Sequence, residues 1–156
     1  MTVNQNDEDL YAWAHLSSAE IITGQYSGVV TSAGATHYTN GTNLPSSDAF
    51  KTIIFALFSM KGNNYMYENI TGLRIRVTSL DASGLPWEAG ASSDSLNAKE
   101  AQAVDMKIDD GSADTGLLIT YTHGNCTTAA YPAESADYNL NSTSRDCIME
   151  WYLNKL

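Results

Sequence analysis

Three aspartates, Asp109, Asp110 and Asp114, have the residue type and the proximity that could bind a metal ion. Carboxylate oxygens are ligands that Ca²⁺ prefers. However, their spacing does not match a complete EF-hand loop, and the bidentate glutamate that closes such a loop is missing. Aspartate also forms tight turns, because its side chain bonds nearby backbone groups. The pattern therefore favours turn formation, with a weak calcium site as the alternative.

Other reactive side chains form no pattern that indicates catalysis. The three histidines, His15, His37 and His123, have no metal-ligand spacing. The sequence contains no Gly-x-Ser-x-Gly elbow, P-loop or dinucleotide fingerprint. We therefore expect a protein that is not an enzyme and that has no cofactor.

Two cysteines, Cys126 and Cys147, lie near the C-terminal end without a CxxC motif. Their flanks are rich in Thr, Asn, Ser and Asp, which favours a disulfide over two free thiols in an apolar core. A disulfide closing this loop stabilises a domain by about 3 kcal/mol in the chain-entropy model. Because disulfides persist in oxidising compartments, we expect an exported protein.

The composition indicates one globular domain over residues 1–156. The chain is 43% hydrophobic and carries a net charge of -10. Such an acidic surface argues against nucleic acid and anionic lipid as partners. Residues 1–7 are polar and do not resemble an export signal. We expect them to be a cloning addition or disordered.

The acidic residues follow an expected short helix at 97–109. Asn97 is a good N-cap, and the carboxylate of Glu100 can reach back to the amide of this cap. Gly111 is a typical end signal. The apolar residues form one narrow stripe at helical spacing: Ala101, Val104 and Ile108.

A longer helix is expected from Glu8 to Thr23, followed by Gly24. Its expected assembly or core face consists of four residues: Leu10, Trp13, Ala14 and Ile21. A surface helix has a polar face about as wide as its apolar face, but this helix is apolar nearly all round. We therefore expect a large core, or a partner outside this domain, to cover it.

Further apolar segments have the length and composition of β-strands. These segments lie at 50–60, 65–68, 73–77, 117–121 and 147–153. Alternation within 73–77 predicts that Arg74 and Arg76 face solvent. The sequence thus predicts an α+β domain, with the N-terminal helix packed across an antiparallel sheet of about four strands and the second helix near 97–109.

Three features together resemble a known family. Residues 11–28 are YAWAHLSSAEIITGQYSG, residues 96–116 are LNAKEAQAVDMKIDDGSADTG, and a cysteine pair precedes a final strand. The order is similar to that of bacterial type IV pilin-like proteins, including pseudopilins. Many of these have a Gly-Tyr-x-Gly-like turn after the first helix. Many also have a Lys-Ile-Asp-Asp-Gly-like segment followed by Thr-Gly.

The resemblance implies a structural subunit of a pilus or secretion-system filament. Such proteins begin with a leader and a long apolar helix, neither of which is present here, so residues 8–23 would be the exposed end of a longer helix. The partners would be other pilin subunits and the assembly machinery, with membrane contact only through the missing segment. The protein would lie in the inner membrane before assembly and in a periplasmic or extracellular filament afterwards. A secreted adhesin or carbohydrate-binding module is the alternative.

Overall fold

The computed structural model describes residues 8–29, 38–60, 72–80, 84, 95–121, 125–129 and 135–153. Its elements are α1 (Glu8–Ser18), β1 (Ile53–Met60), β2 (Gly72–Ser79), α2 (Ala98–Ile108), β3 (Leu118–Thr120) and β4 (Met149–Tyr152). The predicted α+β class is confirmed. The strand predicted at 65–68 and the N-terminal residues 1–7 lie outside the described residues.

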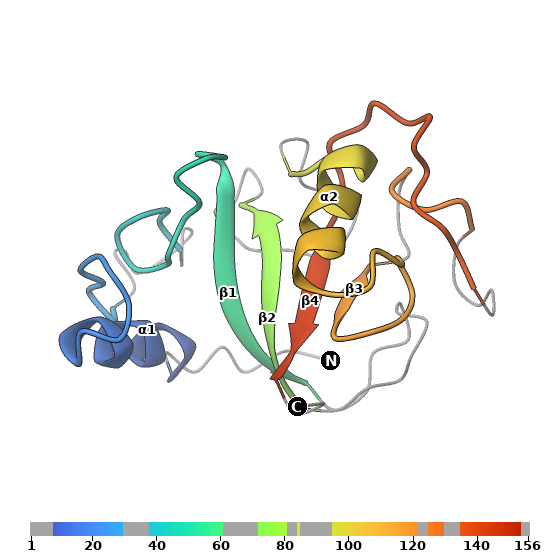
Figure 1. Cartoon of the computed structure of the whole chain (residues 1–156). Helices are drawn as coiled ribbons and strands as arrows, with labels where there is room; N and C mark the ends of the chain where they lie inside the picture. Colours follow the sequence, from blue (N-terminus) through green and yellow to red (C-terminus); the bar gives the residue numbers. More distant parts are fainter. Residues whose placement is uncertain are drawn as a thin grey trace.

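The four strands form one antiparallel sheet in the order β1-β2-β4-β3 (Figure 1). β1 pairs with β2 along its whole length. The last strand, β4, lies inside the sheet, where Trp151 pairs with Ile75 of β2 and with Leu118 of β3. The C-terminal end of the chain therefore joins the two halves of the sheet.

The register separates the strand residues into two faces, because side chains alternate along a strand. On one face, Phe55, Val77 and Met149 lie in one cross-strand row. Helix α2 covers part of this face in front of β4 (Figure 1). Its Ala98 and Ala101 belong to a buried cluster that includes Met149.

The opposite face contains a buried ionic cluster where the sequence predicted solvent. Arg74, Arg76 and Glu150 are almost fully buried. Glu150 accepts a hydrogen bond from Arg76 Nε at 2.7 Å and is also paired with Arg74. Each guanidinium lies over a tyrosine ring, Tyr152 for Arg74 and Tyr121 for Arg76. The prediction that both arginines face solvent was wrong, because a glutamate on the neighbouring strand supplies the opposite charge.

Helix α1 lies beside β1 (Figure 1). Its Leu10 and Trp13 are buried in a cluster with Ile54 and Ala56 of β1, whereas Ala14 is only half-buried. The structure therefore assigns Leu10 and Trp13 to the core of the domain, one of the two roles predicted for this face.

The helix is shorter than predicted, and Ile21 is not part of it. α1 ends at Ser18, where the amide of Ile21 donates to Leu16 O and the amide of Glu20 donates to Ser17 O. This is a Schellman motif, with Glu20 at φ 57° in the position that glycine usually occupies. The chain turns away here, and Ile21 is left 69% exposed. The predicted end at Thr23 was wrong because a residue other than glycine adopts the left-handed conformation.

Candidate functional site

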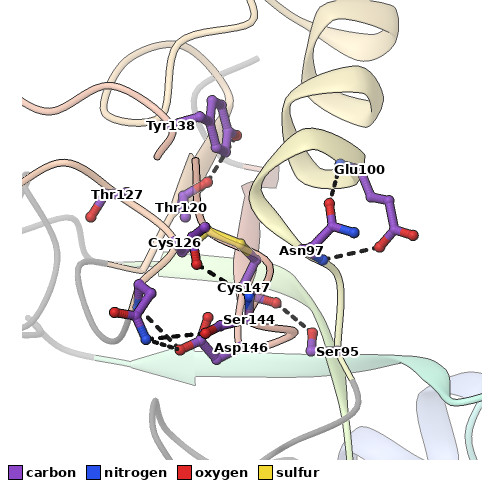
Figure 2. Close-up of a disulfide and its surroundings, with 12 residues drawn as sticks. Ser95, Asn97, Glu100, Thr120, Cys126, Thr127, Tyr138, Ser144, Asp146 and Cys147 are labelled. Carbon is purple, nitrogen blue, oxygen red and sulfur yellow. Dashed lines mark hydrogen bonds between the residues drawn. A yellow bond between two sulfur atoms is a disulfide. The ribbon is translucent and has the colours of Figure 1, made fainter. Parts of the chain in front are cut away.

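The predicted capping box of α2 is confirmed and fixes where the helix begins. The Asn97 side chain accepts a hydrogen bond from the Glu100 amide, and the Glu100 carboxylate accepts one from the Asn97 amide, both at 3.0 Å (Figure 2). The backbone of Leu96, just before the cap, forms a bridge with Cys147. The start of α2 is thereby connected to the residue that bears the second sulfur.

The disulfide between Cys126 and Cys147 is present, as predicted, and both residues are buried (Figure 2). It joins the segment 125–129 to the chain just before β4. Next to it, Ser95 Oγ donates to the carbonyl of Cys147, and the Asn125 amide donates to Asp146 at 3.1 Å. The bridge therefore lies at a junction between α2, β4 and a loop.

Asp109 connects the end of α2 to the start of β3. One of its carboxylate oxygens accepts hydrogen bonds from the amides of Leu117 and Leu118, the latter at 2.9 Å. Gly116 has a φ of 82°, and a Cβ atom added to it would lie 2.0 Å from the same oxygen. Only glycine fits at this position while Asp109 makes these bonds.

The other two predicted aspartates also bond the chain. Asp110 accepts from the Ser112 amide at 2.8 Å and from the Thr115 hydroxyl at 2.7 Å. Asp114 accepts from the Ser112 hydroxyl and, across the fold, from the Ala136 amide at 3.0 Å. Asp110 thus makes the local bonds that were expected of a turn-forming aspartate, whereas Asp114 connects the turn to a distant segment.

Among the described residues, the carboxylates that come together as a group are not the predicted set. Oxygens of Asp105, Asp109 and Asp110 lie within 4.8 Å of one another, and this group could hold a cation. Asp114 is not part of it. The sequence analysis missed Asp105, although its position one helical turn before Asp109 was a usable signal.

Asp105 is fully buried and is already hydrogen-bonded by the chain. It accepts from the Tyr138 hydroxyl at 2.8 Å and from the Gly111 amide at 3.4 Å. Burial raises the pKa of Asp105 from 3.8 to about 6, while the bond from Tyr138 opposes the rise. Burial also raises the pKa of Tyr138 above its ordinary value. The three carboxylates of Asp105, Asp109 and Asp110 therefore act as hydrogen-bond acceptors that stabilise the turn after α2.

An apolar groove with a volume of about 420 Å³ lies on the sheet face that α2 partly covers. Phe55, Ile75 and Val77 contribute from β1 and β2, and Trp151 contributes from β4. Its remaining lining comes from α1 and the segment after it, from residues 45–50, from β3 and from α2 and the residue before its cap. The sequence analysis did not predict this groove, because it depends on which parts of the sheet the two helices leave uncovered.

The histidines do not assemble into a site in the described part of the chain. His15 is exposed on α1, next to the ring of Tyr11. His37 and His123 lie outside the described residues. Their positions therefore add nothing to the expectation that the protein is not an enzyme.

Comparison of the chain with protein-family models, with curated proteins and with solved structures finds no match. Within the described ranges, neither helix has the length and apolar character needed to cross a bilayer.

Proposed function

We propose that this chain is the globular head of a type IV pilin-like or pseudopilin subunit, and that its role is assembly into a filament. The supporting observation is the unit formed by residues 105–118, which includes much of the segment that resembles the family. Asp109 holds the amides of Leu117 and Leu118, and Gly116 leaves space for its carboxylate. The contact between Asp109 and the segment after Thr115 explains why the Asp-Asp-Gly and Thr-Gly elements occur together in this chain. This supports an architecture shared with the heads of pilin-like proteins.

The remaining features agree with a head on the outside of a fibre. A buried disulfide fits a domain that is exported to an oxidising compartment. A net charge of -10 favours a hydrated surface. In this proposal the full subunit lies in the inner membrane first, and its apolar N-terminal helix then packs with those of other subunits in the filament.

The described residues give the carbohydrate-binding alternative less support. Sugar stacking needs an exposed aromatic ring, yet Trp13 is buried and Trp151 is half-buried. Trp87 lies outside the described residues. Tyr11 is the exposed ring on α1, where it already stacks on His15.

The experiment is to locate the protein in the source organism with antibodies raised against this domain. We expect it to label surface fibres, or a periplasmic pseudopilus, in immunogold electron microscopy and to appear in a filament fraction. A gene deletion should remove those filaments, and the unaltered gene should restore them. Complementation with Asp109→Ala should restore fewer, because the head is destabilised. If the protein occurs only as a free secreted monomer and the deletion leaves all filaments intact, the proposal is wrong.

A further inference from the structure

The apolar groove has the size of a small-molecule site. Its volume of about 420 Å³ lies within the range of roughly 300–1,000 Å³ that is typical of ligand pockets. Aromatic side chains form much of its lining: Trp13, Tyr26, Phe50, Phe55 and Trp151. A lining of aromatic and aliphatic groups with few polar ones is also typical of such pockets.

The charge of the lining restricts what can bind. Every described residue that lines the groove is uncharged, and the side-chain hydroxyls among these residues belong to Thr23, Tyr26, Ser46 and Ser47. A cation would find no opposite charge among these described residues. An anion would also be repelled by a chain of net charge -10. The same repulsion acts between two copies of the chain, so an uncharged small molecule is favoured over a second copy.

Two tryptophans that line the groove each have a hydrogen-bond donor without an acceptor in the described part of the chain. The indole nitrogens of Trp13 and Trp151 are buried, and neither has an acceptor among the described residues. A buried indole N–H usually has a partner, because leaving it unsatisfied costs free energy. A ligand oxygen that reached one of them, after a small movement of the ring, would supply the missing acceptor.

We propose that the groove binds an uncharged, mainly apolar molecule with a carbonyl or ether oxygen. The apolar body of the molecule packs against Phe55, Ile75 and Val77 in the groove, and its oxygen accepts a hydrogen bond from Trp13 or Trp151. This binding activity is separate from filament assembly and does not depend on it.

The experiment uses Nile red, an uncharged dye with a carbonyl oxygen, titrated into the whole chain and followed by fluorescence. Ile108 lines the groove and is 47% exposed, so Ile108→Arg should fold and block entry. Met106 lies on the same helix outside the groove and is 68% exposed, which makes Met106→Arg the matched control. We expect Ile108→Arg to weaken binding by about tenfold or more and Met106→Arg by less than about twofold.

A second comparison tests the hydrogen bond itself. Trp13→Phe and Trp151→Phe keep an aromatic ring but remove the N–H group. One of them should weaken binding of Nile red by about two- to tenfold, which corresponds to one hydrogen bond. Neither should change binding of diphenylhexatriene by as much, because that hydrocarbon has no oxygen. Circular dichroism checks the fold of every variant.

Four results would overturn the proposal. The first is the absence of saturable binding of Nile red. The second is an equal effect of Ile108→Arg and Met106→Arg. The third is a dimer in sedimentation that Ile108→Arg dissociates, since the occupant of the groove would then be a second copy of the chain. The fourth is an equal weakening of Nile red and diphenylhexatriene binding in Trp13→Phe and Trp151→Phe. The ligand would then need no oxygen, which contradicts the proposed ligand class.

Discussion

Asp105 is expected to make the stability of the domain depend on pH. Burial raises its pKa from 3.8 to about 6, and the charges of Asp110 and Asp109 add to the rise. The folded protein therefore binds this proton more tightly than the unfolded chain does. The contribution of Asp105 to the free energy of unfolding is therefore fully present below about pH 4. It is lost as the pH rises through about 6, because the carboxylate then ionises in a buried site.

The size of the effect follows from the difference between the two pKa values. A rise from 3.8 to about 6 is about two pH units and corresponds to roughly 3 kcal/mol. Asparagine at this position keeps an oxygen that can accept from Tyr138, but it does not ionise. We expect Asp105→Asn to be more stable than the unaltered protein by up to about 3 kcal/mol at pH 8 and nearly equal to it at pH 4.

The assay is urea denaturation of both proteins at a series of pH values from about 4 to 8, at constant ionic strength. Other carboxylates titrate in the same range, so the quantity to follow is the difference in unfolding free energy between the two proteins. Asp137→Asn, at an exposed position, controls for the loss of one negative charge. A difference between Asp105→Asn and the unaltered protein that stays constant with pH, or that is largest in acid, would refute the reasoning.

Three further predictions concern stability and can be measured by the same denaturation. Gly116→Ala should destabilise the domain by about 1–3 kcal/mol, because the new Cβ atom meets the Asp109 carboxylate at a positive φ. Glu150→Gln should cost about 3–5 kcal/mol, because two buried guanidinium groups lose the same counter-charge. Leu10→Ala should cost about 2–5 kcal/mol, whereas Ile21→Ala should change stability by less than about 0.5 kcal/mol, since Leu10 is buried and Ile21 is exposed.

The parts of the fold that the sequence predicted well depend on neighbouring residues. The Asn97–Glu100 capping box spans four positions, and the turn bonds of Asp110 reach no further than Thr115. Local chemistry of this kind is visible in a short window of sequence. The cysteine pair is a long-range contact, but with two cysteines in the chain only one internal pairing exists.

The parts that could not be predicted depend on contacts between distant segments. Arg74 and Arg76 are separated by more than seventy positions from Glu150, their common partner. Alternation assigned them to one face of β2, but it could not reveal that this face is buried. Similarly, Asp105 gains its high pKa from burial beside Tyr138, which belongs to a segment far along the chain.

β4 is held in the sheet by a nearby disulfide, by a buried ion pair and by pairing with two strands. β4 pairs with both β2 and β3, so the sheet is complete only after the last strand has been placed. Closing such long loops costs conformational entropy before any pairing stabilises the fold. The Cys126–Cys147 bond shortens the path to β4, and Glu150 gives that strand a charged partner on β2. The disulfide and the ionic cluster therefore both hold β4 in its place between β2 and β3.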